Sequence, residues 1–433
     1  MSTKLERIAE IVAKYPNQRL QTLIHHINED TLKEKHKQMP SNKAPGIDSI
    51  TKKEYGENLN ENTQNLVKRL RNQAYKPQPV RRVYIPKIGS DKMRPLGIPA
   101  YEDRLVQGIA ADILNQIYEP EFLDFSYGFR PNRSCHDAIK ALNVIIERRK
   151  TNYIVDVDIK GFFDNVNHKW MMKFLEHRIQ DKNFLRLITR FLKSGIMEEG
   201  KYLENETGTP QGGLISPILA NVYLHYVIDL WFEHIVKKNL KGECYMVRYA
   251  DDFVCCFQYQ QEANKFYQAL QNRLNKFGLE ISKDKTKTIE FGRFAQENRK
   301  RKGLGKPETF TFLGFTHYCG LSRKGKFRVK RKTNAVRFRA KVAAIKQWLW
   351  NNMHTPIKEL IKKLNIKLQG HYRYYGITDN FKSIETFCYL VRRQLFKTLK
   401  RRSQKSGLTW GLFVLMLNVF PLAKPKIYIN IYE

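Results

Sequence analysis

The spacing of apolar and polar residues predicts alternating helices and strands over the first three quarters of the chain. Helical spacing dominates residues 1–75, with a turn at 44–46, and returns over 101–150 and 167–195. Residues 153–160, Y-I-V-D-V-D-I-K, alternate strictly and predict a strand. Two further regions predict paired strands: 80–98, around a Gly-Ser-Asp turn, and 246–257, a β-hairpin with Ala250, Asp251 and Asp252 at its tip.

Helices and one more strand complete this pattern. The turn G-T-P-Q-G-G precedes a helix with Pro217 in its first turn. A helix is expected over 263–277, and T-F-T-F-L-G-F, residues 309–315, predicts a strand. Beyond residue 325, apolar residues at helical spacing predict a separate helical domain: Ile357, Leu360, Ile361, Leu364 and Leu368. The fold class is therefore α+β.

Composition indicates a folded chain of more than one packed unit. The chain has 433 residues, of which 42% are apolar. The most apolar stretch, 410–423, is interrupted by Asn418 and Pro421 and is too short to span a membrane. The six cysteines form no C-x-x-C pair, so we expect neither a zinc site nor a disulfide framework, and a reducing cytosol fits.

Charge points to a polyanionic partner. Seventy-seven Lys and Arg against 42 Asp and Glu give a net charge of +35. Eleven basic residues and no acid lie between 321 and 350, and a second basic cluster covers 392–402. Nucleic acid is the partner this excess favours, with a ribosome-associated or anionic-membrane protein as alternatives.

A few acids stand out against this basic background. On the expected strand, Asp156 and Asp158 share one face, and the adjacent pair Asp251–Asp252 lies at the hairpin tip. If the strand and the tip meet, three carboxylates converge, and such oxygen ligands favour Mg²⁺. The alternative is a solvated Asp-Asp turn, but strand-forming neighbours weigh against it.

Several motifs then occur in the order typical of one family. They are A-P-G-I-D from Ala44, Y-G-F-R-P-N-R-S, the Asp158 strand, G-T-P-Q-G-G-L-I-S-P-I-L-A-N, R-Y-A-D-D and F-L-G-F. Together they resemble the group II intron-encoded reverse transcriptases and maturases. The resemblance implies a right-hand polymerase fold, with fingers and palm followed by a helical thumb.

The resemblance also implies roles for the acids. Asp158, Asp251 and Asp252 correspond to the catalytic residues that hold two Mg²⁺ ions, with Mn²⁺ as a substitute. Asp158 precedes Phe162 by four positions, as the family pattern requires, so Asp156 becomes a supporting acid. Phe162 would be a gate against the ribose 2′-hydroxyl that selects dNTPs. An ordinary core phenylalanine is its alternative, and Phe163 is the neighbour expected in the core.

Further residues take their roles from the resemblance. The nucleotide-binding set is Lys87, Arg94, Phe162, Gln211 and Lys285, with Lys283 and Lys287 as alternatives to Lys285. Primer and template contacts fall on Tyr249, Ala250, Phe312, Leu313, Gly314 and Phe315. Residues 368–376 interleave aromatics with a base, which fits either a nucleic-acid contact or a helical core containing Tyr372 and Tyr375.

Four domains are expected from the resemblance. They are an N-terminal extension with the start of the fingers (1–79), fingers and palm (80–325), a thumb or maturase X domain (326–395) and a short DNA-binding tail (396–433). The bacterial type lacking a C-terminal HNH endonuclease is the closest in pattern, so we expect no second-strand cleavage.

The expected function is RNA-directed DNA polymerisation with binding of a group II intron RNA as a splicing maturase and a role in retrohoming. The partners are template and intron RNA, a DNA primer or target, and dNTPs, with no membrane; a dimer is one possible state. A bacterial cytoplasmic location, with ribonucleoprotein or nucleoid, follows. The alternatives are a relative recruited to phage defence or CRISPR spacer acquisition, and a splicing cofactor without polymerase activity.

Overall fold

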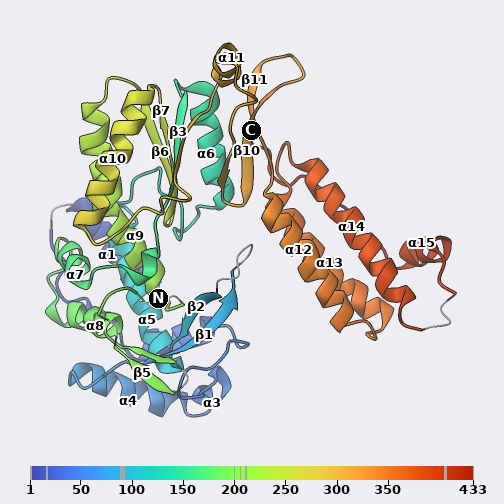
Figure 1. Cartoon of the computed structure of the whole chain (residues 1–433). Coiled ribbons are helices and arrows are strands. Elements are labelled where there is room, and N and C mark those ends of the chain that lie inside the picture. Colours follow the sequence, from blue (N-terminus) through green and yellow to red (C-terminus); the bar gives the residue numbers. More distant parts are fainter. Residues whose placement is uncertain are drawn as a thin grey trace. The chain divides into compact units, whose positions relative to one another are not determined.

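The structure, a computed structural model, describes residues 2–15, 18–87, 93–198, 200–204, 206–209, 212–403 and 407–432 (Figure 1). The chain divides into two compact units. The first contains residues 1–86, 92–138 and 155–288, and the second contains 87–91, 139–154 and 289–433. This division differs from the four sequence-based domains, which remain predictions.

The first unit begins with helices and a small sheet. The helices are α1 (Ser2–Lys14), α2 (Glu29–Gln38), α3 (Lys52–Glu57) and α4 (Leu59–Arg71). The strands β1 (Val80–Pro86) and β2 (Met93–Ile98) pair antiparallel, as predicted, while β4 (Ile196–Glu198) and β5 (Lys201–Leu203) extend the sheet in the order β2-β1-β4-β5. α5 (Tyr101–Tyr118) follows and is almost wholly buried, which suits a central helix.

The central sheet carries the acids of interest. Its order is β6-β7-β3-β8, formed by β6 (Cys244–Tyr249), β7 (Asp252–Phe257), β3 (Tyr153–Asp158) and β8 (Lys287–Glu290). On β3, Val155 and Val157 are buried while Asp156 and Asp158 are partly exposed, so the alternation read from the sequence is confirmed.

Further helices alternate with these strands along the chain. They are α6 (Cys135–Arg148), α7 (His168–Glu176), α8 (Lys182–Leu192), α9 (Ser216–Leu224) and α10 (Gln260–Lys276). α9 starts with Pro217 in its first turn, as expected, and continues into the π-helical turns η3 (His225–Asp229) and η4 (Phe232–Val236). α10 packs on β7, where the rings of Phe257 and Phe266 lie 5.0 Å apart.

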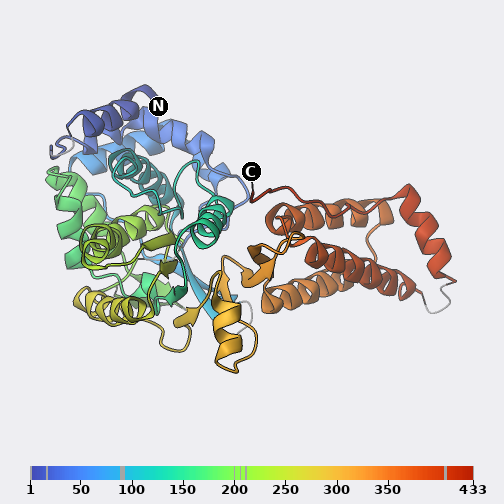
Figure 2. The same ribbon diagram turned by 90° about the horizontal axis from the view of Figure 1, so that it is seen from above.

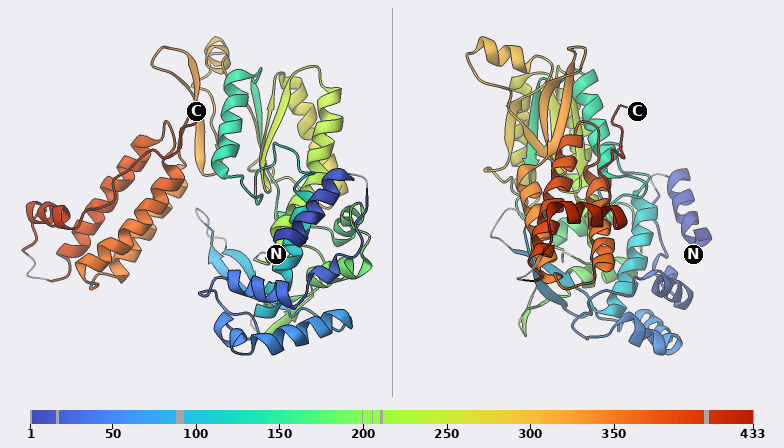
Figure 3. Two further views of the ribbon diagram at one scale, coloured as in Figure 1. Left: turned by 180° about the vertical axis from the view of Figure 1, so that it is seen from behind. Right: turned by 90° about the vertical axis from the view of Figure 1, so that its right-hand side faces the viewer.

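The second unit combines a three-stranded sheet with a helical bundle. The sheet, in the order β11-β10-β9, contains β9 (Phe310–Phe312), β10 (Phe315–Leu321) and β11 (Phe327–Thr333). α11 (Ala295–Arg301) precedes it, and α12 (Ala335–Asn351), α13 (Ile357–Tyr375), α14 (Phe381–Lys400) and α15 (Trp410–Val419) follow. Figures 1, 2 and 3 show α12, α13 and α14 side by side. Their buried apolar side chains form one core.

Three details depart from the sequence-based elements. Residues 309–315 form two strands separated by a turn at Leu313–Gly314, rather than one strand. Residues 327–333 form a strand that pairs with β10, so the helical bundle starts at 335 instead of near 326. The helical region 167–195 is two helices, because Asp181 caps α8 and starts it anew.

Of the two readings for residues 368–376, the core reading fits Tyr372. Its side chain is fully buried in the apolar core of the bundle. Within the described residues, no helix combines the length and apolar character needed to cross a membrane.

Candidate active site

The acid pair lies at a tight hairpin turn. Tyr249 at the end of β6 pairs with Asp252 at the start of β7, which leaves Ala250 and Asp251 as the two turn residues. Ala250 adopts a φ of +57° and is 6% exposed. A left-handed backbone conformation at a residue other than glycine costs roughly 1–3 kcal/mol, so it persists only where the surrounding structure imposes it.

A buried ion pair beneath the turn supplies that constraint. Arg248 and Asp229 are both fully buried, and the Arg248 Nε donates to the Asp229 carboxylate at 2.8 Å. The same guanidinium donates to the carbonyl of Ala250 at 3.1 Å and to the Asn221 Oδ1 at 3.2 Å. It also donates to the Ser126 hydroxyl at 2.7 Å. Arg248 therefore ties the strained turn residue to η3 and α9.

The motif F-S-Y-G-F-R-P-N-R buttresses the same turn. The amide of Tyr127 donates to the Arg248 carbonyl, and the amide of Arg248 donates to the Phe125 carbonyl, both at 2.8 Å. A Cβ on Gly128 would lie 2.3 Å from the Ala250 nitrogen, so glycine is required for this close approach. The Asn221 amide donates to the Gly128 carbonyl at 2.7 Å.

Asp158 ends β3 beside a lysine. Its carboxylate accepts a hydrogen bond from the Lys285 Nζ at 2.8 Å, and both side chains are about half exposed. The backbone fixes this pair, because the Ser282 amide donates to the Asp158 carbonyl at 2.8 Å and the Thr286 hydroxyl accepts from the Asp158 amide at 3.3 Å. Lys285, rather than Lys283 or Lys287, is thus the lysine that contacts Asp158 among the described side chains.

Electrostatics connect Asp158 with the hairpin tip. Burial raises the pKa of the Asp251 carboxyl, and the negative charge of Asp158 raises it further. The Asp251 backbone amide, Arg94 and Arg248 act in the opposite direction on that pKa. Asp251 is thus a carboxyl whose ionisation is opposed by its surroundings and would be favoured by a nearby cation.

The donor chemistry at this site fits a hard divalent cation. Asp158, Asp251 and Asp252 offer only carboxylate oxygens, which Mg²⁺ prefers. The repulsion between Asp158 and Asp251 is the physical sign that a cation would stabilise both. Within the described part of the chain, no three His, Cys, Asp or Glu side chains are close enough together to form a finished metal site. In the present arrangement the Lys285 ammonium supplies the positive charge to Asp158.

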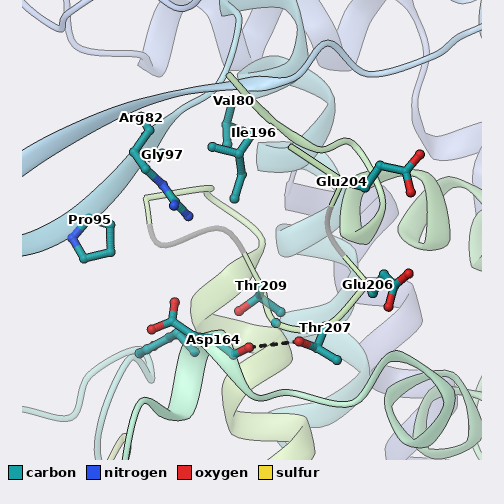
Figure 4. A pocket seen from close by; sticks show the side chains of 12 residues that line it. Val80, Arg82, Pro95, Gly97, Asp164, Ile196, Glu204, Glu206, Thr207 and Thr209 are labelled. Atoms are coloured by element: carbon teal, nitrogen blue, oxygen red, sulfur yellow. Dashed lines mark hydrogen bonds between the residues drawn. The ribbon is translucent and has the colours of Figure 1, made fainter. Parts of the chain in front are cut away.

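A cavity of about 570 Å³ lies between the small sheet and the segment that follows β3. Figure 4 shows Arg82 and Pro95 on one side of it and Asp164, Thr207 and Thr209 on the other. The Thr207 hydroxyl donates to the Asp164 carbonyl at 3.2 Å within this second wall. The acids at the hairpin tip do not belong to its lining, so this is a neighbouring pocket on the same unit.

The two adjacent phenylalanines occupy different environments. Phe162 is 2% exposed, and its ring packs edge-on against Phe163 at 5.2 Å and Tyr223 at 6.4 Å. Phe163 is partly exposed and lines the cavity. A buried ring has no free face for a sugar, so the structure moves the gate candidate from Phe162 to Phe163, the reverse of the sequence-based assignment.

The remaining candidates for nucleotide binding are Lys87, Arg94 and Gln211. Arg94, on β2, is exposed and near enough to Asp251 to influence its pKa, while Lys87 directly follows β1 and is exposed. Gln211 lies outside the described residues. Gly212 has a φ of +113°, and a Cβ there would lie 2.4 Å from the Gly97 carbonyl oxygen. This glycine therefore allows close backbone approach, but toward β2.

The candidate primer contacts of the second unit form a two-residue hairpin turn. Phe312 and Phe315 pair at its base and are fully buried, while Leu313 and Gly314 both have positive φ. The Tyr374 hydroxyl donates to the Leu313 carbonyl at 2.9 Å. The two phenylalanines thus support the turn, and Leu313 and Gly314 are buried with them.

Sequence reasoning missed the supporting residues. The sequence shows Arg248 as a cation within an apolar strand, and a buried cation needs a charged or hydrogen-bonding partner. Its partner Asp229 lies nineteen residues earlier in a π-helical turn, and no spacing rule connects the two. Phe163 was visible too, but its exposure depends on the short helical turn η2 (Phe162–Asp164), which the sequence pattern did not indicate.

Two family models match the sequence of this chain. A family model described as reverse transcriptase (RNA-dependent DNA polymerase) matches residues 85–317, and one described as group II intron, maturase-specific domain matches residues 337–412.

Curated relatives point the same way. The group II intron-encoded protein LtrA of Lactococcus lactis subsp. cremoris is 31% identical, covering 78% of this chain and 67% of the relative. Protein YkfC of Escherichia coli (strain K12) is 34% identical, covering 59% of this chain and 75% of that protein. A putative COX1/OXI3 intron 2 protein of Saccharomyces cerevisiae is 29% identical over 59% of this chain and 27% of its own length.

Proposed function

The chain belongs to the group II intron-encoded reverse transcriptases and maturases, and from this premise we propose how its residues carry out RNA-directed DNA polymerisation. The observation that carries the proposal is the electrostatic effect of Asp158 on Asp251, because the negative charge of Asp158 opposes ionisation of Asp251 and a cation shared by the two carboxylates would offset it.

Asp158, Asp251 and Asp252 would hold the metal, and Arg248 would hold the turn that presents two of them. Two Mg²⁺ ions bound there would stabilise the attacking 3′-oxygen and the leaving pyrophosphate oxygen during in-line transfer. Mn²⁺ has the same preference for oxygen ligands and would substitute. Lys285 lies 2.8 Å from Asp158 and would place a cation beside the reacting phosphates, where it would offset charge or donate a proton.

Nucleotide binding is assigned to neighbouring groups. Arg94 would contact the triphosphate, because it is exposed and already influences Asp251. Lys87 and Gln211 stay as family-based proposals for the same role. Phe163, on the wall of the cavity, would lie against the sugar and exclude a 2′-hydroxyl, with the buried Phe162 behind it. Tyr249, Ala250 and the Leu313–Gly314 turn would support the primer end.

The second unit is proposed to serve as thumb and maturase domain. Its helices α12, α13 and α14 fall within the region matching the maturase-specific family, and their sequence is strongly basic. We assign binding of a parent intron RNA to this part, with assistance to splicing and cDNA synthesis at a DNA target, in the bacterial cytoplasm. Residues 396–433 would add a DNA contact.

The proposal is tested by RNA-templated primer extension with the purified chain. Wild-type protein should make Mg²⁺-dependent cDNA, and Asp158→Asn should abolish it while still binding the hybrid. Lys283→Ala serves as the matched control for Lys285→Ala, since only Lys285 contacts Asp158. A wild type that binds intron RNA and promotes splicing without making cDNA would favour the splicing cofactor instead.

A further inference from the structure

A second hollow lies in the helical bundle of the second unit, between the last turns of α12 and α14. Its volume is about 380 Å³, within the range of small-ligand sites. The lining residues are Lys346, Gln347, Trp350, Gln394, Lys397, Thr398 and Arg401. They come from two helices that pack directly on each other, so their backbones fix the spacing of the hollow.

The charge of this pocket has one sign. Lys346, Lys397 and Arg401 are exposed at its rim. α12 contains no Asp or Glu, and no acid occurs between residues 386 and 432. Three cations held together without a neighbouring acid in their own segments repel one another and favour an anionic ligand.

An aromatic surface accompanies the cations. Trp350 is 52% exposed although α12 buries Ile345 and Leu349 in the core of the bundle. The Arg401 guanidinium lies 6.0 Å from the Trp350 ring. An indole kept at the surface beside cations offers a planar face for a base.

The pattern extends along α14. Tyr389, Arg393, Lys397 and Arg401 recur every four residues and so follow one face of the helix. Tyr389 is 54% exposed, and the Arg393 guanidinium lies 5.7 Å from its ring. One exposed aromatic residue and three cations thus share this face, and such a combination of a stacking ring with basic groups binds single-stranded nucleic acid without sequence preference.

This pocket is separate from the turn proposed to support the primer. Arg337, at the start of α12, is the residue near Gly314, whereas Trp350 lies thirteen residues further along. At 1.5 Å per residue, the two positions are roughly 20 Å apart along the helix. The pocket therefore has its own surface within the unit.

We propose that the α12–α14 pocket binds an unpaired nucleotide of RNA, with its base against Trp350 and its flanking phosphates held by Lys346, Lys397 and Arg401. The inference rests on the proposed maturase function and names the surface of the maturase-specific region that contacts RNA. An acidic protein segment would satisfy the cations but would leave the exposed indole without a planar partner.

The test measures binding of a short fluorescein-labelled oligouridylate to the full chain by anisotropy. The protein is first saturated with an unlabelled RNA–DNA primer-template hybrid, which occupies the polymerase site. Trp350→Ala should weaken oligouridylate binding about tenfold, and Trp350→Phe should retain most of it, because phenylalanine still stacks. Lys397→Ala combined with Arg401→Ala should lower the slope of log affinity against log salt by about 1.4, the value for two phosphate contacts on a single strand.

Controls of the same chemistry lie in the first unit. Tyr259 is 49% exposed, and Lys238 and Lys241 are exposed in the same unit, but the Glu262 carboxylate accepts from the Lys241 amide, so this surface is not acid-free. Tyr259→Ala and Lys238→Ala with Lys241→Ala should leave binding unchanged. The Trp350 variants should keep primer extension on an unrelated RNA template.

The assignment would be overturned by equal affinity of Trp350→Ala and wild type, by stronger binding of a duplex RNA than of the oligouridylate, or by a glutamate peptide whose binding depends on Trp350. Preference for oligothymidylate over oligouridylate would also contradict RNA as the ligand. Failure of wild-type protein to bind the hybrid or make cDNA would count against the proposed function rather than against the pocket.

Discussion

Replacing Arg248 with methionine should lower both the free energy of unfolding and the rate of catalysis, for two different reasons. Arg248 and Asp229 are fully buried, so Arg248→Met leaves an unpaired carboxylate with no access to water. Breaking a buried pair in this way costs about 3–5 kcal/mol. With a denaturant dependence of roughly 3 kcal/mol per molar urea, the unfolding midpoint should fall by about 1 M.

The catalytic effect has a different origin. Arg248 also donates to the Ala250 carbonyl at 3.1 Å, and its charge opposes the rise in the pKa of Asp251. Without it the turn loses a constraint and Asp251 is protonated more readily. We therefore expect a lower kcat, a higher Mg²⁺ requirement and an acidic limb of the pH–rate profile that moves to higher pH.

A second substitution separates the two effects. Arg248→Met with Asp229→Leu removes both charges, so most of the lost stability should return, as replacement of buried pairs by apolar groups often allows. Activity should stay low, because the bond to Ala250 is still missing. Single-nucleotide incorporation and urea unfolding on the same preparations provide the measurement. Recovery of both stability and activity in the double variant would refute a positioning role for Arg248.

Three further outcomes follow from individual contacts. Phe163→Ala should admit rNTPs, whereas Phe162→Ala should mainly lower the free energy of unfolding, by about 3–5 kcal/mol. Competition between dNTPs and rNTPs measures the selectivity of each variant. Use of rNTPs by Phe162→Ala but not by Phe163→Ala would contradict the gate role of Phe163. Gly128→Ala should reduce incorporation through displacement of the Ala250 backbone, whereas Gly370→Ala, where an added Cβ meets nothing within 4 Å, should not; equal rates would remove the buttress argument. Burial lowers the pKa of His225 to about 4 from an ordinary 6.5, so between these pH values the unfolded chain binds a proton that the folded chain does not bind. The neutral His225 therefore contributes roughly 3 kcal/mol to the free energy of unfolding above pH 6.5, and this contribution is lost as pH falls toward 4. His225→Gln should flatten that part of the urea stability curve, and an unchanged curve would contradict the assignment.

Elements with a clear local pattern of apolar and polar residues could be predicted from the sequence. Alternation placed Asp156 and Asp158 together on β3, and apolar flanks placed Asp251 and Asp252 at a hairpin tip. The short strands β4, β5 and β8 were missed, because three or four residues carry too little periodicity to stand out.

The assignment at Phe162 and the single strand expected at residues 309–315 both depend on features that a local pattern of apolar and polar residues does not determine. Which of two adjacent rings faces a cavity depends on the helical turn η2, and that turn is set by tertiary contacts. The Leu313–Gly314 turn was readable in principle, because a glycine between paired phenylalanines suits a two-residue hairpin. The Arg248–Asp229 pair required the fold itself, since η3 and β6 meet only in three dimensions.

Asp158, Asp251 and Asp252 are proposed to hold the metal ions that activate the primer 3′-hydroxyl and the incoming nucleotide. Single-nucleotide incorporation on an RNA template, measured against Mg²⁺ concentration for wild type and Asp251→Asn, tests this proposal most directly. Loss of one metal-binding carboxylate should remove several kcal/mol of transition-state stabilisation, so the rate should fall on the order of 10³-fold at every Mg²⁺ concentration. Wild-type rates in Asp251→Asn would contradict the account.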